Sequence, residues 1–448
     1  MASKRSPAWM AGPMGGLVLR PWFDRLALAG MVRGYFPLSR LWAAAEAAGD
    51  DVDLFAAEVP MAPLKGWRRS RAQAALAHAL LLRGLAEKAE ADWRDALFAP
   101  GATQDPAQAE ALRVQASFVS MRTRARFAFL RRRAPAVRFA PVAPQHLEAR
   151  FGRHRADPAT LFATADLAVR GSRTIRRDGM VERWLRFPCP YDDIGGEGWA
   201  HVYEPEGGFD HTVVMCHGLG IEADAWGEGL AMAPPLVARG LRVIEPEAPW
   251  HGRRRPVGLQ AGEPFVARGP MGAIDIFAAH VPEIGALVRW ARETAGGKVA
   301  IGGISLGALG TQLAVAHAAT WPAEARPDAA LFVTTTDRLD EVAWDGGFAT
   351  GFGTARAFSS VGWTREKVAE WLPLTAPIGD PGIDPGQIVM ALGTADTITP
   401  YAGGAAFARR WAIPRENLFV SWQGHFSVAL GLARDPRPIA RLAELLRA

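Results

Sequence analysis

Short apolar runs alternate with segments of helical spacing from residue 178 to the end of the 448-residue chain. The six later runs are HTVVMC, LRVIEPE, KVAIGG, AALFVTTT, QIVMALG and NLFVSW. Strands that alternate with helices pair in parallel and are covered by helices on both faces, so they read as continuous apolar runs. The pattern predicts an α/β fold with a mostly parallel central sheet. Two earlier runs, VERWLRFPCP and GWAHVYEP, are joined by YDDIGGE and predict an antiparallel hairpin.

The first 177 residues have a different organisation. Stretches such as Ser70–Ala99 are rich in alanine and leucine at i, i+3 and i+4 spacing. Proline-rich breaks fall near residues 60–64, 100–106 and 134–144. Helices of this kind must bury one face, and four tryptophans are too many to leave in water. These are Trp22, Trp42, Trp67 and Trp93. We therefore predict a helical N-terminal region, residues 1–177, that packs against a catalytic domain, residues 178–448.

Charge is divided unevenly between these two parts. Residues 1–177 hold 28 Lys and Arg against 15 Asp and Glu, while the remainder holds 23 against 31. The strongest basic run, Met121–Arg133, has Phe127, Phe129 and Leu130 interleaved, but no nucleic-acid-binding signature accompanies it. We expect no nucleic-acid partner. The run is either a membrane-surface helix that makes peripheral membrane contact, or part of a docking face for the acidic remainder.

Composition excludes several classes of protein. The chain is 49% hydrophobic and 22% charged, as expected of a soluble globular protein and not of a disordered or fibrous one. Its two cysteines, Cys189 and Cys216, form no disulfide framework and lack metal-site spacing, so a cytoplasmic location is expected. No secretory signal and no membrane-spanning run of about 18 apolar residues is evident. The sequence predicts neither a metal nor a cofactor.

The segment GGISLGALG follows the apolar run VAI directly and places Ser305 between Gly303 and Gly307. A G-x-S-x-G sequence between strand and helix is typical of a nucleophile elbow, a turn that lifts the serine hydroxyl clear of the sheet. The turn strains the serine backbone by about 1–3 kcal/mol and leaves room only for glycine on either side. The alternative is a small residue packed where helix meets sheet.

Three more strand ends carry suitable chemistry. In open α/β sheets the ligand site lies outside the carboxyl ends of the strands. The run VVMC leads into HGLG (His217–Gly220), VMALG leads to Asp396, and LFVSW leads to His425. The order serine, aspartate, histidine along the chain is that of α/β-hydrolase triads.

Other residues compete for these roles. Asp337 and Asp340 follow the preceding strand run and are alternatives to Asp396 as the acid. His425 could instead be a capping or core histidine. For His217 and His251 we expect a structural role, in which each ring braces its glycine-containing turn.

Together the motifs HGLG, GISLG, GTADTITP and GHFS resemble the α/β-hydrolase superfamily from about residue 198 onward. The segment EAPWHGRRRP (Glu247–Pro256) is similar to a poorly characterised branch of domain-containing α/β hydrolases. The resemblance implies Ser305 as nucleophile, His425 as general base and acid, and Asp396 as the orienting carboxylate. It also implies an oxyanion hole formed by the backbone amides of Leu219 and Leu306.

Two departures leave the subfamily open. The HGLG turn lacks the extra glycines of HGGG esterases, and Ile304 stands where many lipases and esterases have histidine or an aromatic residue.

The expected function is a serine hydrolase that cleaves a small-molecule carboxylic ester through an acyl-enzyme. An acyltransferase with the same triad is one alternative, and a binding protein on a retained hydrolase fold, tethered by its basic N-terminal region, is another. Residues 335–386 are longer than a usual connection and could form a cap over an apolar pocket. Their aromatic residues are Trp344, Phe348, Phe352, Phe358, Trp363 and Trp371. These rings could equally pack the insertion against the body.

Overall fold

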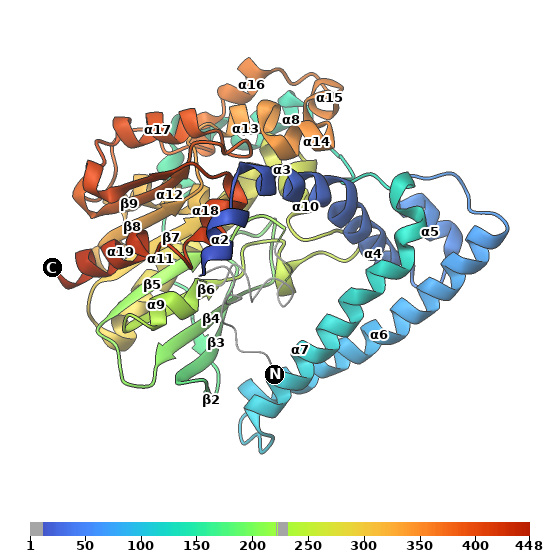
Figure 1. Cartoon of the computed structure of the whole chain (residues 1–448), viewed down its shortest axis with the longest axis horizontal. Coiled ribbons are helices and arrows are strands. Elements are labelled where there is room, and N and C mark those ends of the chain that lie inside the picture. The colour runs from blue at the N-terminus through green and yellow to red at the C-terminus, as the bar shows by residue number, and fades with distance from the viewer. Residues whose placement is uncertain (1–11, 221, 223–231) are drawn as a thin grey trace.

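The computed structural model describes residues 12–220, 222 and 232–448 (Figure 1). Within these residues one sheet of ten strands runs in the order β1-β3-β4-β6-β5-β7-β8-β9-β10, and β2 pairs with β3. The strands are β1 (Arg170–Gly171), β2 (Ile175–Arg177), β3 (Met180–Pro188), β4 (Glu197–Pro205), β5 (His211–Cys216), β6 (Leu241–Pro246), β7 (Val299–Ile304), β8 (Ala329–Val333), β9 (Ile388–Gly393) and β10 (Leu418–Ser421). All eight runs that the sequence pattern marks as strands are strands of this sheet.

Across the sheet the pairing changes once, from antiparallel to parallel, at β6. β3, β4 and β6 pair antiparallel, whereas β6, β5, β7, β8, β9 and β10 are parallel neighbours. β6 follows β5 in the chain but lies between β4 and β5. An antiparallel start followed by this exchange and a run of parallel strands is the α/β-hydrolase fold, so the predicted fold class is confirmed.

The sheet extends further toward the N-terminus than the sequence pattern suggests. β1 and β2 lie before residue 178, inside the segment predicted to be helical, and both pair antiparallel with β3 at the sheet edge. These strands are two and three residues long and include exposed arginines. Strands so short contain too few apolar positions to produce a recognisable alternation.

Helices cover both faces of the sheet, as predicted. α11 (Pro270–Ala295) and α12 (Leu306–His317) pack on one face, and α9 (Ala233–Val237) and α19 (Arg437–Arg447) pack on the other. By length and hydropathy α11 could span a membrane, and the window responsible is wholly buried inside the protein.

Shorter helices complete the α/β domain. These are α10 (Glu263–Ala267), α13 (Leu339–Asp345), α14 (Gly347–Phe352), α15 (Thr354–Ser359), α16 (Arg365–Ala369), α17 (Tyr401–Arg410) and α18 (His425–Gly431). Single 3-10 turns occur at Pro158–Thr160, Gly252–Arg254, Ala318–Thr320, Ala323–Ala325, Leu372–Leu374, Pro385–Gln387 and Arg415–Asn417. α13 to α16 form the insertion between β8 and β9.

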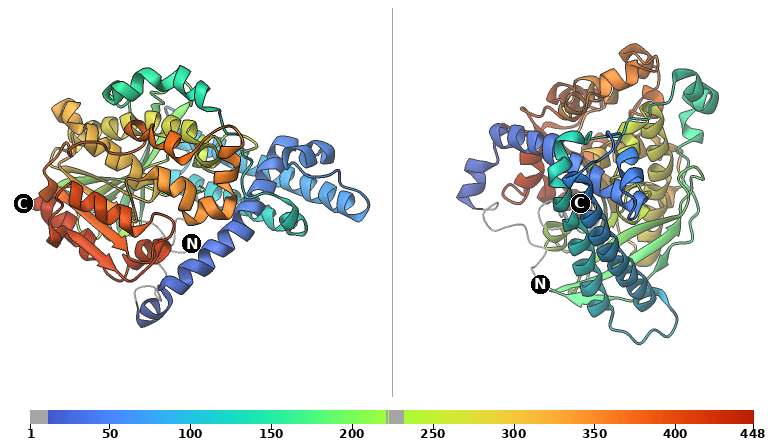
Figure 2. Two further views of the ribbon diagram at one scale, coloured as in Figure 1. Left: turned by 90° about the horizontal axis from the view of Figure 1, so that it is seen from above. Right: turned by 90° about the vertical axis from the view of Figure 1, so that its right-hand side faces the viewer.

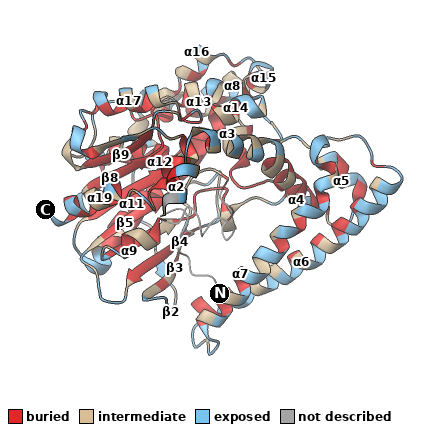
Figure 3. Ribbon diagram, viewed as in Figure 1, coloured by how far each residue is buried: buried red, intermediate tan, exposed pale blue. Residues whose placement is uncertain are grey.

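The N-terminal region is helical up to Ala156 and has a small core of its own. Its elements are α2 (Pro13–Val18), α3 (Pro21–Gly30), the π-helix η1 (Met31–Tyr35), α4 (Phe36–Ala48), α5 (Val52–Glu58), α6 (Trp67–Phe98), α7 (Pro106–Arg122), the 3-10 helix η2 (Thr123–Arg133) and α8 (Pro144–Ala156). α6 and α7 form a long hairpin beside the α/β domain (Figures 1 and 2), and much of its outer surface is exposed (Figure 3). α3 contacts α18 and α14.

The basic run 121–133 contributes to the core of this region. Phe127 and Leu130 are fully buried among residues of α4, α5 and α6. Arg131, Arg132 and Arg133 are exposed. Phe127 and Leu130 are therefore occupied within the protein, and the three arginines at the end of the run face solvent.

Candidate functional site

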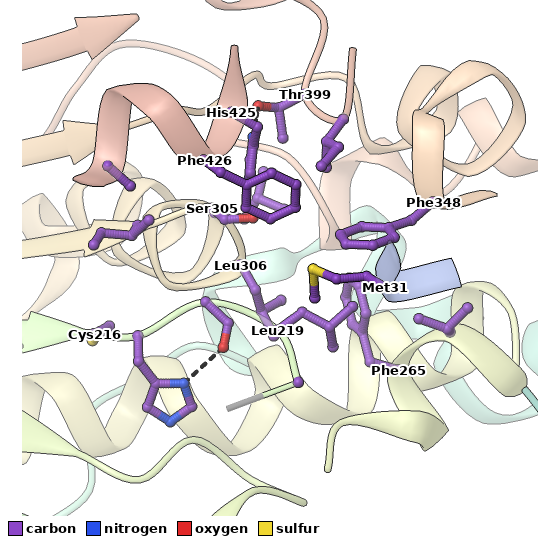
Figure 4. Close-up of a pocket in the computed structure, with 18 of the residues that line it drawn as sticks. Met31, Cys216, Leu219, Phe265, Ser305, Leu306, Phe348, Thr399, His425 and Phe426 are labelled. Atoms are coloured by element: carbon purple, nitrogen blue, oxygen red, sulfur yellow. Dashed lines mark hydrogen bonds between the residues drawn. The ribbon is translucent and has the colours of Figure 1, made fainter. Parts of the chain in front are cut away.

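A cavity of about 950 Å³ lies at the carboxyl ends of β5 and β7. Figure 4 shows Ser305 and His425 at this cavity, together with Met31 of the N-terminal region and Phe348 of the insertion. The apolar part of the wall includes Phe23, Met31, Phe265, Phe348, Phe358 and Trp371. The cavity is thus covered partly by the insertion, as one reading of its aromatics predicts, and partly by α3 and η1, which the sequence did not indicate.

The insertion aromatics divide between the two predicted roles. Phe348, Phe352, Phe358 and Trp371 line the cavity. Trp363 does not line it; its buried indole N–H donates to the Val142 carbonyl oxygen at 2.6 Å. The insertion is therefore both a cap over the cavity and a packed part of the body.

Ser305 occupies a sharp turn between β7 and α12. Its φ of 55° and ψ of −116° place a non-glycine residue in a strained region of backbone conformation. A Cβ at Gly303 would lie 2.2 Å from the Gly307 carbonyl carbon, and one at Gly307 would lie 2.3 Å from the Cys216 carbonyl oxygen. Only glycine fits at these two positions, for the reason that the G-x-S-x-G spacing suggested.

His425 and Asp396 form a buried pair. His425 Nδ1 lies 2.8 Å from Asp396 Oδ2, and both side chains are less than one tenth exposed. Asp396 Oδ1 accepts the backbone N–H groups of Ile398 and Thr399 at 2.8 and 3.0 Å, and the Thr399 hydroxyl donates to Oδ2 at 2.8 Å. Because these donors fix the carboxylate, it in turn fixes the imidazole ring and directs Nε2 away from Asp396.

Ser305 and His425 both line this cavity and are drawn together in Figure 4. No hydrogen bond of 3.5 Å or less joins the Ser305 hydroxyl to the His425 ring, although both residues are described. Such bonds are often longer in free enzymes and tighten when substrate binds. The structure therefore brings all three predicted residues to one site, with the histidine–carboxylate contact made and the serine–histidine contact open.

The two competing acids are occupied elsewhere. The Asp337 carboxylate pairs with the Arg410 guanidinium. Asp340 accepts two hydrogen bonds from Arg338, at 2.9 and 2.7 Å. Neither acid bonds to His425, so the geometry favours Asp396 as the partner of the imidazole.

The predicted oxyanion-hole donors flank the serine. Leu306 is the first residue of α12, where a backbone N–H has no partner within its helix. Leu219 lies in the HGLG turn and lines the same cavity. A Cβ at the neighbouring Gly218 would lie 3.6 Å from Ser305 Cβ, which shows how closely the turn approaches the elbow. Leu219 and Leu306 therefore both lie in the wall of the cavity that Ser305 lines.

His217 and His251 brace the turns on which they lie, as expected. His217 Nε2 accepts the Ala248 N–H at 3.1 Å, so its Nδ1 donates to the Gly218 carbonyl oxygen at 2.8 Å. His251 Nε2 accepts the Gly220 N–H at 3.2 Å, with Nδ1 directed at the Pro249 carbonyl oxygen at 2.9 Å. Burial lowers the pKa of His217 to about 4 and that of His251 well below its usual value. Both rings are neutral supports of the HGLG turn.

A polar end of the cavity lies toward α7 and β4. Its wall includes Glu110, Arg113, Arg177, His201 and Tyr203. Arg113 donates to Glu110 at 2.7 Å, and the Tyr203 hydroxyl lies 2.8 Å from His201 Nδ1. The cavity thus has one apolar end and one end lined by charged and hydrogen-bonding groups.

Sequence reasoning missed three supporting residues. Thr399 follows Asp396 within GTADTITP, and its spacing from the acid was a signal that could have been used. Asp24 bonds to the first turn of α18, and the Tyr35 hydroxyl donates to the Gly220 carbonyl oxygen at 3.3 Å. Both are too far from the motifs in the chain for any local signal. Among the described residues, no group of three or more His, Cys, Asp and Glu side chains is arranged to hold a metal ion.

No protein-family model matches this chain, and no curated protein matches it. Similar solved structures include an acetyl xylan esterase from Paenibacillus sp. R4, which is 15% identical, with 66% of this chain and 93% of that chain covered and a TM-score of 0.47. A cold-adapted esterase from an Arctic intertidal metagenomic library is 18% identical, with 61% and 97% covered and a TM-score of 0.38. An S-formylglutathione hydrolase from Agrobacterium tumefaciens is 14% identical, with 63% and 100% covered and a TM-score of 0.37.

Proposed function

We propose that this chain, which has the α/β-hydrolase fold, is a serine hydrolase that cleaves a carboxylic ester through an acyl-enzyme. The observation that carries the proposal is the buried His425–Asp396 pair, which lies at one cavity margin with a serine on a strained elbow. The structural relatives whose names include esterase or hydrolase agree with this reaction class.

In the proposed mechanism Ser305 attacks the ester carbonyl carbon. A serine hydroxyl is a weak nucleophile at neutral pH, so His425 Nε2 takes its proton as the carbon–oxygen bond forms. Asp396 holds the ring with Nδ1 protonated and stabilises the imidazolium that results. His425 then gives the proton to the departing alkoxide, and the alcohol leaves.

The acyl-enzyme is released by the reverse sequence of proton transfers. Water attacks the acyl carbonyl carbon while His425 accepts its proton, and the same proton returns to Ser305 as the carboxylic acid departs. Negative charge develops on the carbonyl oxygen in both halves of the reaction. The amides of Leu219 and Leu306 are proposed to stabilise it, and one such donor is worth about 100- to 1000-fold in turnover.

The cavity supports an ester with an apolar acyl group. Its volume of about 950 Å³ lies at the upper end of small-molecule sites. Aromatic side chains from the N-terminal region, α10 and the insertion form the apolar wall. Burial of acyl methylene groups there favours binding by about 0.8 kcal/mol each.

The direct test is labelling with a serine-reactive fluorophosphonate, followed by mapping of the modified residue. We expect the label on Ser305. The Ser305→Ala variant should cleave no p-nitrophenyl ester of short or medium chain, because alanine lacks the nucleophile. Its thermal melt should show that the fold is intact. Equal hydrolysis by parent and variant would exclude the proposed nucleophile.

An acyltransferase is the second candidate, and the polar end of the cavity favours it because an acceptor alcohol or amine could bind there. Turnover in the presence of a small alcohol separates the two activities. A hydrolase gives mainly the free acid, whereas a transferase gives mainly the new ester. A binding protein without catalysis is less well supported, since it would keep elbow strain of about 1–3 kcal/mol to no purpose.

A further inference from the structure

Asp24 belongs to α3, yet its carboxylate bonds to the helix that carries His425. Oδ1 accepts the backbone N–H groups of Phe426 at 2.6 Å and Ser427 at 3.0 Å, and Oδ2 accepts the Ser427 hydroxyl. These N–H groups belong to the first turn of α18, where they have no partner within their own helix. Asp24 therefore serves as the N-cap of α18, although it is more than 400 residues away in the chain.

The residues around Asp24 and the start of α18 leave space for this contact. The residue before α18 is Gly424, which has no side chain that could cap the helix. A Cβ at Gly424 would lie 2.4 Å from Asp24 Cγ, so the carboxylate fills the space that a side chain would need. Gln423 Nε2 also donates to the Leu19 carbonyl oxygen at 3.1 Å. Asp24 itself is only 8% exposed.

We propose that Asp24 is a positioning residue for His425, an inference that rests on the proposed function. His425 is the first residue of α18, so the orientation of this turn decides where its ring meets Asp396 and Ser305. Phe426, whose N–H bonds to Asp24, also lines the cavity beside Phe348 (Figure 4). Asp24 does not line the cavity and acts through the backbone of α18.

The N-terminal region also contacts the HGLG turn, on the other side of the site. Tyr35 donates to the Gly220 carbonyl oxygen, and Arg124 Nη2 donates to Glu222 at 2.7 Å, just beyond the HGLG turn. Arg124 Nη1 also donates to the Ser39 hydroxyl at 2.9 Å. The N-terminal region thus contacts the histidine helix and the HGLG turn directly, and it completes the site in addition to covering it.

The test compares Asp24→Ala, Asp24→Asn and a matched control, Asp51→Ala. Asp51 caps α5 in the same region, accepting the N–H groups of Asp53 and Leu54 at 2.8 and 3.0 Å, far from the cavity. We expect Asp24→Ala to lower kcat for a p-nitrophenyl ester by roughly 10- to 100-fold with KM within about twofold, because small displacements of a catalytic group are costly. Asparagine caps helices about as well as aspartate, so Asp24→Asn should keep kcat within about threefold.

Asp51→Ala should lower the melting temperature by about 1–2 °C and leave kcat unchanged. If Asp24→Ala lowers only the melting temperature, as this control does, Asp24 is a structural cap and the proposal is wrong. Should Asp24→Ala not fold, Ser427→Ala removes one of the three hydrogen bonds and should lower kcat by about threefold.

A spectroscopic measurement keeps the inference separate from the proposed activity. In protein labelled with 15N-histidine, the His425 signals are identified by their loss in His425→Gln. We expect them to shift in Asp24→Ala and to stay in place in Asp51→Ala. An inactive parent that shows this shift would contradict the proposed function and support the positioning role. Unshifted signals would overturn the inference.

Discussion

Four contacts fix the orientation of the Asp396 carboxylate. It accepts two backbone N–H groups on Oδ1 and both the Thr399 hydroxyl and His425 Nδ1 on Oδ2. Four donors around one buried carboxylate hold it more firmly than the imidazole contact alone would. This arrangement accounts for the residues that follow the acid in the GTADTITP motif.

At this scale the clearest prediction is for Asp396→Asn. The asparagine oxygen can still accept the Ile398 and Thr399 N–H groups, but its amide nitrogen then faces His425 Nδ1 and favours the wrong tautomer. We expect kcat for ester cleavage to fall by about 10⁴-fold, with little change in the melting temperature. Asp337→Asn is the control, since Asp337 pairs with Arg410, and it should stay within a few-fold of the parent. The opposite ranking of the two variants would identify Asp337 as the acid.

At the scale of elements, the turn from β7 to α12 depends on close approach between backbones. Gly307 lies against the end of β5, and Ser305 N–H donates to the Val333 carbonyl oxygen of β8 at 3.0 Å. Three parallel strands therefore meet at the elbow. Any group larger than hydrogen at Gly307 would push α12 away from the sheet.

Gly307→Ala tests this packing. Its Cβ would meet the Cys216 carbonyl oxygen, which cannot move without disturbing β5, so we expect the free energy of unfolding to fall by about 2–3 kcal/mol. Gly84→Ala in the exposed part of α6 is the matched control, because nothing lies within 4 Å of a Cβ there. It should raise the free energy of unfolding by roughly 0.5–1 kcal/mol. Urea unfolding of both variants measures the difference, and equal effects would contradict the packing argument.

At the scale of the whole molecule, two of three consecutive arginines join the α/β domain to the N-terminal region. Arg253 lies 4.5 Å from the Trp93 ring centroid and 4.2 Å from that of Trp184, and it donates to Glu90 at 2.8 Å. Arg255 pairs with Glu46 of α4. Arg254 instead pairs with the buried Glu283 of α11, at 2.7 and 2.8 Å. The HGRRRP segment therefore has a structural role in docking the N-terminal region.

This docking predicts the result of removing residues 1–150. Trp184 and Trp199 pack against Trp93 of α6, so the deletion would expose both rings, uncover one wall of the cavity and remove Asp24. We expect aggregated or sharply destabilised protein, measured by size-exclusion chromatography and thermal melting. A soluble, monomeric and fully active product would instead mean a separable module. Flotation of the isolated N-terminal fragment with anionic vesicles would then test whether its exposed arginines bind a membrane surface.

Features that depend on neighbours in the chain could be predicted from the amino-acid sequence alone. Buried parallel strands read as apolar runs, and the elbow requires glycine two residues on either side of Ser305. Asp396 and His425 follow strand ends directly, so their meeting at one edge of the sheet follows from parallel topology. Local spacing contains this information because each constraint acts within a few residues.

The surroundings of that site depend on long-range contacts in the folded chain. Asp24 meets Phe426 across 402 positions of sequence, and α3 covers the cavity together with an insertion more than 300 residues later. Neither contact has a fixed spacing that a pattern could reveal. The two short edge strands before residue 178 also depend on β3 as a partner, since two or three residues have no strand pattern of their own. Many helix and strand faces in the sequence are equally apolar. Which of them pack against each other depends on the whole folded chain and not on local spacing.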